Sequence, residues 1–301
     1  MMKRRRFVKY SILSAPVLAA EVTVLPLIKF KPAERLKSGI KLSFQDGIAP
    51  GRNLEEIFDF MEEYGITGFE PRANDIIKNV SKYQKLLKYR NIRISAVQSG
   101  YKGFLCSGNR IVRDEYLCRM KEIIDFSGEL GANGVIIMPE TPRTVFPDKN
   151  SAVIHMDAID NLYKLAEYAG RHNTTIILKP VKRKEASWIN NVSQAADICR
   201  TVNLKGLRCM GDLWHMSGQE KSDKDDIIAG GEFINHIHIA SRKTRFMPGE
   251  DGLNDNYTDA FRALKKISFT GFISFACGIT GNKNQTIASS LRLLDSQWQS
   301  A

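Results

Sequence analysis

The chain has 301 residues, of which 43% are hydrophobic and 26% are charged. This globular composition excludes a disordered chain, a collagen-like chain and a small disulfide framework. The formal charge at pH 7 is +11, but five of the positive charges lie in residues 1–20. The remaining +6 is spread along the chain without a basic block, so the charge gives no reason to expect a nucleic-acid partner.

The first twenty residues have the pattern of an export signal. Basic residues at positions 3–6 precede a mostly apolar segment, Tyr10 to Ala20, that ends in small residues. Paired arginines before such a segment are typical of bacterial twin-arginine signals. An uncleaved anchor reaching Ile28 is the alternative, but Glu21 would be costly inside a membrane. We predict a twin-arginine-type signal at 1–20, a linker at 21–37, and export to the periplasm or beyond with no stable membrane span after cleavage.

From Ile40 onward, short apolar runs alternate with amphipathic ones, as strands alternate with helices. Helical spacing is clear in Val112–Leu130, and Asn53 with Glu56 predicts a capping box for the first helix. Glycines at 65, 131 and 170 indicate left-handed helix ends just before strands. The eight predicted strands are Ile40–Phe44, Gly68–Glu70, Ile92–Val97, Gly134–Met138, Thr175–Leu178, Leu207–Asp212, Ile234–Ile239 and Phe272–Phe275.

Eight strand–helix units in about 260 residues predict a closed α/β barrel. Strands this apolar are covered on both faces, which favours a parallel sheet. No Gly-x-Gly-x-x-Gly motif follows the first strand, so an open dinucleotide-binding sheet is not favoured. We predict one domain, residues 38–301, folded as a single parallel (β/α)8 barrel of the TIM type.

The residues that close the predicted strands are mostly polar. Functional groups of such barrels lie at the C-terminal ends of the strands, so these side chains converge on one mouth. Polar or ionisable residues close seven of the eight strands, and they are Gln45 with Asp46, Glu70, Gln98, Glu140, Lys179, Asp212 and His238. This concentration favours a polar pocket over an ordinary surface.

Two neighbouring strand ends carry residue types that bind metals. Asp212 is followed three residues later by His215, and His238 closes the next strand. A carboxylate with an imidazole suits a divalent ion such as manganese or cobalt, although two ligands do not make a site. Of His236 and His238, we expect one ring to face the barrel interior and the other to face the helices.

Several segments share a pattern with one known family. They are SFQDGIAPG, GFEP, ELGANGVIIMPE, RKEA, MGDLWHM and HIHIASRKTRFMPGED. In these segments the chain resembles the xylose-isomerase-like barrels of the sugar phosphate isomerase/epimerase group, which includes ketose 3-epimerases and hydroxypyruvate isomerases. The likeness runs from Lys41 to about Gly278, nearly the whole barrel.

The resemblance implies a sugar site at the mouth of the barrel. Members of the family hold one divalent ion, such as manganese, cobalt or zinc, with Glu, Asp, His and Glu from strands five to eight, and they move a proton beside a carbonyl. Asp212 and His238 match the Asp and His ligands. Glu185 and His215 match groups that hold the oxygens of the sugar. Arg245 matches the substrate-binding arginine if its loop carries one extra residue.

Both glutamates of the family pattern are replaced, by Lys179 and Ala276. A lysine ammonium at the metal position would repel a divalent ion by several kcal/mol at an effective dielectric constant of about 20. We therefore expect no metal at full occupancy. We also expect Lys179 to pair with Asp212, and with Glu70 or Glu140.

We favour a carbohydrate-binding relative whose catalysis is weakened or lost. The sugar would lie against the aromatic rim of Trp188 and Trp214, with Glu70 and Glu140 as further contacts. The two replacements remove both proton-transfer groups that the resemblance implies, and general acid–base catalysis is typically worth 10² to 10⁴-fold. The sequence leaves open which sugar binds and whether the chain forms a homo-oligomer.

Two alternatives keep an active isomerase or epimerase. In one, Lys179 acts as a base or as a Schiff-base amine. In the other, Asp212, His215, His238 and Glu140 form a rewired metal site. DNA-repair enzymes of the endonuclease IV type share this barrel, but their three-metal cluster needs more histidines than the five present.

Overall fold

The computed structural model describes residues 39–102, 104–138, 151–186, 188–219 and 221–301. The predicted signal (1–20), the predicted linker (21–37) and the predicted site residue Glu140 lie outside these ranges. Within them, the helices are all too short or too polar to cross a membrane.

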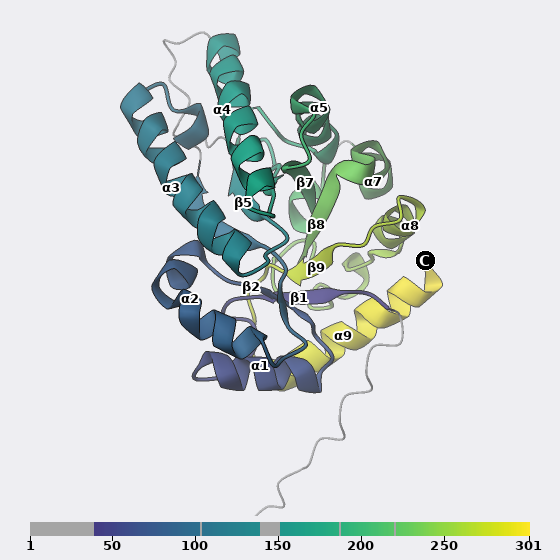
Figure 1. Ribbon diagram of the computed structural model, residues 1–301. Coiled ribbons are helices and arrows are strands. Elements are labelled where there is room, and N and C mark those ends of the chain that lie inside the picture. Colours follow the sequence, from purple (N-terminus) through teal and green to yellow (C-terminus); the bar gives the residue numbers. More distant parts are fainter. Residues whose placement is uncertain (1–38, 103, 139–150, 187, 220) are drawn as a thin grey trace, which may run out of the picture. The chain divides into compact units, whose positions relative to one another are not determined.

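The described strands form one parallel sheet, in the order β3-β2-β1-β9-β8-β7-β6-β5-β4 (Figure 1). This confirms the predicted α/β barrel. The strands are β1 (Leu42–Gln45), β2 (Gly68–Glu70), β3 (Arg93–Ile94), β4 (Val97–Lys102), β5 (Val135–Met138), β6 (Ile176–Leu178), β7 (Leu207–Asp212), β8 (Ile234–Ile239) and β9 (Phe272–Phe275).

The barrel closes where the third predicted strand divides. That strand was expected to run unbroken from Ile92 to Val97, but it forms β3 and β4, which are the two ends of the sheet. The Ser95 N–H donates to the Phe69 carbonyl at 2.9 Å, and the Val97 N–H donates to the Gly134 carbonyl at 2.9 Å. The Asn133 N–H also donates to the Ile94 carbonyl at 3.2 Å, and the Gln98 N–H donates to the Pro71 carbonyl at 3.0 Å. The segment therefore bonds to the neighbours on both of its sides, and this closes the barrel.

The helices follow the strands in the alternation that the sequence predicted. Asn53 caps the first of them by accepting the Glu56 N–H at 3.0 Å. The predicted capping box is wrong in its second half, because Glu56 accepts from the Arg52 backbone N–H at 2.9 Å and from the Asn53 side-chain amide at 3.3 Å, and not from the Asn53 backbone N–H. The helices are α1 (Leu54–Glu63), α2 (Ala73–Leu87), α3 (Arg110–Glu129), α4 (Ser151–Arg171), α5 (Val192–Val202), α6 (Leu213–Met216), α7 (Asp223–Gly230), α8 (Thr258–Lys266) and α9 (Lys283–Ser300).

Two of the three predicted glycine helix ends have left-handed backbone. Gly65 has φ +72° and Gly131 has φ +64°. Gly170 does not end its helix, since it lies inside α4, and the left-handed residue before the next strand is Asn173, with φ +55°. Asparagine tolerates this conformation better than most residues, which explains why a glycine is not required there.

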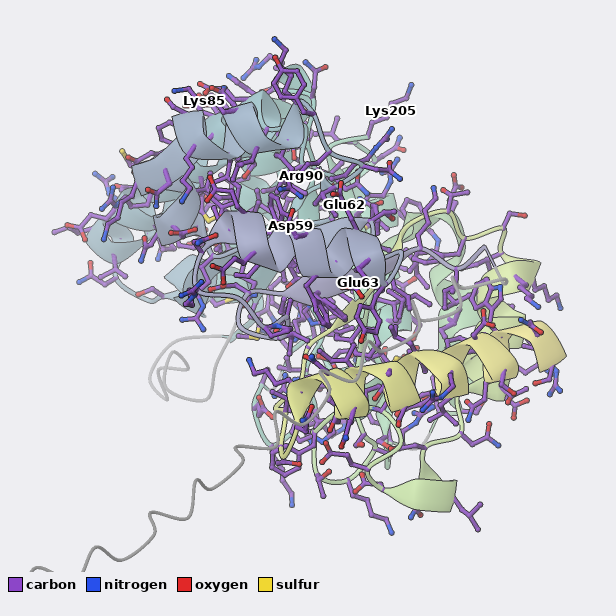
Figure 2. All side chains as sticks on the ribbon, turned by 90° about the horizontal axis from the view of Figure 1, so that it is seen from below. Asp59, Glu62, Glu63, Lys85, Arg90 and Lys205 are labelled. Carbon is purple, nitrogen blue, oxygen red and sulfur yellow. The ribbon has the colours of Figure 1, made fainter. Side chains whose placement is uncertain are left out.

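One end of α1 is held by an ion-pair cluster. The Arg90 guanidinium lies 2.6 Å from Asp59 and 3.0 Å from Glu62. Figure 2 labels the three residues beside α1. The Asn91 N–H donates to Glu62 at 2.9 Å. Because Arg90 follows α2, the cluster joins α1 to the segment that leads into β3.

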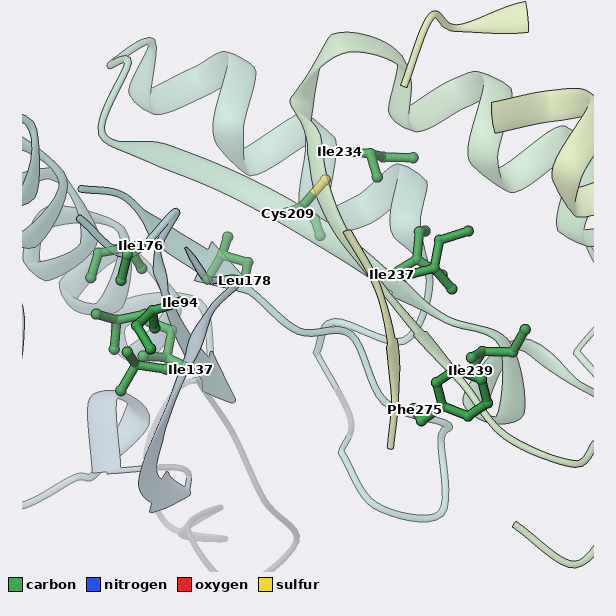
Figure 3. Packing of buried hydrophobic residues seen from close by; sticks show 14 of the residues in the cluster. Ile94, Ile137, Ile176, Leu178, Cys209, Ile234, Ile237, Ile239 and Phe275 are labelled. Atoms are coloured by element: carbon green, nitrogen blue, oxygen red, sulfur yellow. The ribbon is translucent and has the colours of Figure 1, made fainter. Parts of the chain in front are cut away.

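The strands bury side chains on both faces. Their outward side chains, among them Ile237, Ile239 and Phe275, pack in the main core under the helices (Figure 3). Inside the barrel, a separate apolar cluster is formed by Ala96, Ile136, Ile177 and Met210. Side chains two residues apart on a strand face the same way. The inward positions that follow this cluster are Gln98, Met138, Lys179 and Asp212.

Candidate functional site

A cavity of about 190 Å³ opens at the C-terminal ends of the strands. The structure brings five of the predicted site residues to its wall: Lys179, Glu185, His215, His238 and Arg245. Gln45 and Gln98, predicted only to close their strands, also line it. The remaining lining residues were not predicted, and they are Ser99, Gly100, Ile136 and Met138. We call this cavity the mouth.

Lys179 lies between the two residues that the resemblance assigned as metal ligands. Its Nζ is 2.7 Å from Asp212 Oδ2 and 3.1 Å from His238 Nδ1. Lys179 and Asp212 are only 7% and 2% exposed. Burial opposes ionisation of Asp212, but Lys179 together with His238 and His215 outweighs it and holds the pKa of Asp212 well below its ordinary value. The two side chains form a buried ion pair.

Asp212 also organises the turn that carries two further site residues. Its Oδ1 accepts the Trp214 N–H at 3.1 Å and the His215 N–H at 3.2 Å. Asp212 thereby caps the single turn of α6 through Oδ1, while its Oδ2 faces the Lys179 ammonium in the ion pair.

Glu70 forms the floor of the mouth and is fully buried. It accepts from Gln45 Nε2 at 2.8 Å, His236 Nε2 at 2.9 Å and His238 Nε2 at 3.1 Å. Burial alone would raise the pKa of Glu70, but His238 and His236 hold it below its ordinary value. Glu70 does not contact Lys179 directly; His238 lies between them.

The expectation that His236 and His238 face opposite sides is wrong. Both rings meet Glu70 inside the barrel, with centroids 5.2 Å apart. The physical reason is the two-residue period of a strand, which puts positions 236 and 238 on one face and Ile237 on the other. Burial lowers the pKa of His236, which therefore donates to Glu70 as a neutral ring.

The hydrogen bonds assign the tautomer of His238. The Lys179 ammonium has only donors, so Nδ1 of His238 must accept from it. The proton of the neutral ring is then on Nε2, which donates to Glu70. One chain of contacts therefore runs Asp212–Lys179–His238–Glu70 across the mouth.

Glu185 and His215 lie side by side on the wall of the mouth. His215 Nδ1 accepts the Lys182 N–H at 3.4 Å and lies 3.7 Å from Glu185 Oε1. Burial lowers the pKa of His215 to about 3, so the ring is neutral at pH 7. With Nδ1 accepting, Nε2 carries the proton and is available to an oxygen of a ligand. Glu185, whose side chain is 44% exposed, offers acceptor oxygens beside it.

Trp214, predicted to contact the sugar, is not among the residues that line the mouth, and its ring carries two cations. The Arg245 guanidinium lies 4.3 Å and the Lys182 ammonium 3.2 Å from the centre of its ring. Trp188 does not line the mouth and stacks on His155 at 4.3 Å. Lys182 was not singled out from the sequence, although the run of cations directly after a strand end, Lys182 to Lys184, could have revealed it.

The backbone of Arg245 is held in an unusual conformation. Its φ is +61°, a left-handed value that costs free energy for a residue with a Cβ atom. Two hydrogen bonds hold it there, from the Arg245 N–H to the Ser241 carbonyl at 3.2 Å and from the Gly278 N–H to the Arg245 carbonyl at 2.9 Å. The guanidinium also approaches Asp212 to 3.8 Å. Arg245 is thus positioned before any ligand arrives.

A larger hollow, of about 780 Å³, lies at the opposite ends of the strands. Its cations include Lys41 and Arg208, which donate to the Thr270 carbonyl at 3.1 Å and the Leu207 carbonyl at 2.7 Å. These contacts satisfy backbone groups near the strand starts. We therefore place the chemistry of the chain at the smaller mouth.

The ligand set implied by the resemblance does not suit a metal ion here. Ala276 offers no donor atom, and the Lys179 ammonium, which cannot accept, already occupies the shared approach to Asp212 and His238. Glu70, His236 and His238 form a second group, with ligand atoms within 4.8 Å of one another. These are suitable ligand types for a metal. In this arrangement, however, both ring nitrogens that face Glu70 hold protons.

The chain matches a model of a known protein family. The family model described as "Xylose isomerase-like TIM barrel" matches residues 58–297. The chain belongs to this family. The match covers all the described elements from within α1 to within α9, and so includes every strand that reaches the mouth except β1.

Several sugar epimerases are similar to this member of the xylose isomerase-like barrels. The 3-dehydro-D-guloside 4-epimerase of Escherichia coli (strain K12) is 22% identical over 248 residues, which are 78% of this chain and 91% of the relative. The crystal structure of 3-keto-D-glucoside 4-epimerase from E. coli has a TM-score of 0.77, with 22% identity, and covers 85% of this chain and 99% of its own.

A ketose epimerase with bound sugar has the same fold. The D-allulose 3-epimerase of Methylomonas sp. in complex with D-allulose has a TM-score of 0.74 and 16% identity, and it covers 87% of this chain and 99% of its own. The D-psicose 3-epimerase of Enterocloster bolteae is 25% identical over 114 residues, 38% of this chain and 37% of the relative.

Proposed function

We propose that this chain binds a carbohydrate at the mouth and that its proton-transfer chemistry is weakened or lost. The observation that carries the proposal is the position of the Lys179 ammonium, 2.7 Å from Asp212 and 3.1 Å from His238. A fixed cation there replaces the charge of a metal ion but not its open coordination sites. A metal ion can bind two sugar oxygens at once, whereas the Lys179 ammonium, which already has two partners, has one N–H donor left.

The wall of the mouth supplies what a sugar needs. His215 offers a ring N–H, Glu185 offers carboxylate oxygens and Arg245 offers guanidinium N–H groups, while Ile136 and Met138 offer apolar surface. A cavity that combines a few convergent polar groups with apolar surface is typical of small-molecule sites. The printed names of the relatives, which are sugar epimerases, support a carbohydrate as the ligand.

The contacts of Lys179 do not favour the alternative of an active enzyme in which Lys179 acts as a base or as a Schiff-base amine. Both roles need a free electron pair on Nζ. The amine here is paired with a carboxylate and hydrogen-bonded to an imidazole nitrogen, and both contacts stabilise the ammonium form. Glu70 accepts hydrogen bonds on both oxygens and Asp212 is held in the ion pair with Lys179, so both are poor candidates for the missing bases.

The proposal is tested by metal analysis together with sugar binding. The purified chain should hold well under one equivalent of manganese, cobalt or zinc. Calorimetry should show that methyl β-D-glucoside or D-psicose binds with an affinity that does not depend on added manganese. Proton NMR in heavy water should show no exchange of sugar C–H protons. Stoichiometric metal, or rapid exchange, would contradict the proposal.

A second test restores the two glutamates and measures whether metal binding is gained. Lys179→Glu combined with Ala276→Glu should create tight manganese binding, because it restores both carboxylates of the implied ligand set. Lys205→Glu makes the same Lys-to-Glu replacement on an exposed residue at the far end of the barrel and should create none (Figure 2). A folded double variant that takes up no more manganese than this control would show that the two positions do not meet at one ion.

A further inference from the structure

A second cavity, of about 650 Å³, is formed by the loop after β6 and the segments that flank α6 and precede α5 and α7. Among the described residues, no acidic side chain lines it. We call it the basic cavity, and its charged and amide side chains are Lys182, Arg183, Lys184, Lys221, Asn191 and Gln219.

One turn of the chain serves both the basic cavity and the mouth. Glu185, on the wall of the mouth, donates its N–H to the Lys182 carbonyl at 2.7 Å. Lys182 donates its own N–H to His215 at 3.4 Å, and its ammonium lies 3.2 Å from the centre of the Trp214 ring. A sugar that contacts His215 and Glu185 in the mouth is therefore next to Lys182, at the edge of the basic cavity.

The positive charge of this turn is not neutralised by ion pairs. In the part of the chain that the structure describes, Lys182, Arg183 and Lys184 form no salt bridge, while Lys221 donates to Ser193 Oγ at 2.7 Å. Burial lowers the pKa of Lys182; the nearby Glu185 opposes this, and Arg245 and Lys184 add to it. Such an excess of cations over acids among the described residues of the cavity attracts an anion.

The start of α5 does not supply this attraction. Its first N–H groups, of Val192 and Ser193, donate to the Asp226 carboxylate at 2.8 and 2.9 Å. The anion-binding capacity of the basic cavity therefore comes from the lysine and arginine side chains of the 182–184 turn.

We propose that the natural ligand is an acidic sugar, whose anionic group binds in the basic cavity while its ring lies in the mouth. This inference rests on the proposed function, because it assumes that a sugar occupies the mouth. A carboxylate, a sulfate and a phosphate share the required chemistry, and the planar guanidinium of Arg183 suits each of them.

Calorimetry with matched glycosides tests the proposal. Methyl β-D-glucuronide differs from methyl β-D-glucoside in carrying a carboxylate at C6, and the 6-sulfate and 6-phosphate of the glucoside give the other two anions. In about 20 mM salt, at least one anionic glycoside should bind about tenfold more tightly than the neutral one, which is the effect of two or three partly exposed ion pairs. The advantage should shrink in about 300 mM salt.

Charge-neutralising variants identify the site. Arg183→Gln with Lys184→Gln should remove most of the advantage and leave the affinity for the neutral glucoside unchanged, since neither residue lines the mouth. Lys205→Gln, at the opposite end of the barrel, should change neither affinity.

Each other outcome overturns a defined part of the argument. Equal affinities for the acidic and neutral glycosides would overturn the acidic-sugar inference and leave the proposed function standing. An anionic advantage that survives in the Gln variant would place the anion elsewhere and also overturn it. If neither kind of glycoside binds, the proposed function fails and this inference fails with it.

Discussion

At the scale of single residues, the buried pair of Lys179 and Asp212 determines both the stability and the chemistry of the mouth. Removing one partner of a buried ion pair leaves an uncompensated charge, which typically costs 3 to 5 kcal/mol, whereas removing both charges is far less costly. Lys179→Met should therefore lower the free energy of unfolding by about 3 kcal/mol. Adding Asp212→Asn, which retains an acceptor for α6, should recover most of the loss.

Urea unfolding of both single variants and the double variant measures this coupling. Additive effects of the two substitutions would show that the charges do not interact as the 2.7 Å contact indicates. Lys205→Met is the matched control, because the same side chain is removed from an exposed position.

The sequence predicted some of these residues better than others, for a physical reason. Asp212 and Lys179 were found because strand ends meet at one mouth, whatever the details of packing. The role of His236 was missed because its partner, Glu70, lies across the barrel on β2, 166 positions away in the chain. Contacts across the interior depend on which strands face each other, and local sequence patterns do not carry that information.

At the scale of elements, α1 depends on a loop cation for its attachment to the rest of the barrel. The Arg90 side chain is 18% exposed and meets Asp59 and Glu62 of α1 at the same time. Arg90→Gln leaves two neighbouring carboxylates without their cation, and should lower the free energy of unfolding by about 1 kcal/mol. Arg52→Gln removes a single, exposed pair with Glu56 and should cost less.

Hydrogen exchange followed by mass spectrometry distinguishes a local effect from a global one. In Arg90→Gln, the amides of α1 should exchange faster than those of β7 and β8, because the lost contact holds α1 alone. Uniformly faster exchange in all elements would contradict the proposed role of Arg90 as a local attachment.

The bounds of the strands were predictable where a change in residue composition occurs at both ends of an apolar segment. Strands β2, β7, β8 and β9 begin and end at the predicted residues. The prediction of one unbroken third strand was wrong because regular strand pairing is interrupted at Ser95 and Ala96, although the segment bonds to neighbours on both sides before and after them. Apolar residues in a sequence indicate that a segment is buried. Because the segment is largely buried on both sides of the interruption, the sequence pattern does not reveal it.

At the scale of the whole molecule, closure of the barrel puts six ionisable groups into one water-poor centre: Glu70, Lys179, Asp212, His215, His236 and His238. The sequence predicted the barrel because eight repeated units reinforce one another, even when single boundaries are off. It could not predict the protonation states, because these depend on burial and on partners from several strands.

The pH dependence of stability follows from those protonation states. His215, with a pKa of about 3, and His236, with a lowered pKa, are neutral in the folded chain, whereas unfolded histidines titrate near 6.5. Below pH 6.5 the unfolded chain therefore binds more protons than the folded one, and stability must fall with pH. Glu70 and Asp212 have lowered pKa values, so their contribution is present above their ordinary pKa values near 4 and is lost only below them.

Between pH 6.5 and 4.5 the two histidines should dominate, and each can remove up to about 1.4 kcal/mol per pH unit from the free energy of unfolding. Urea unfolding at pH 7.5, 6.0 and 5.0 measures the slope. His215→Gln should flatten it by about the share of one histidine, because glutamine has no proton to gain. His172→Gln, which changes a ring that is 37% exposed, should leave the slope as it is. An unchanged slope in His215→Gln would mean that the His215 ring is not held neutral by its burial beside Lys179 and Arg245.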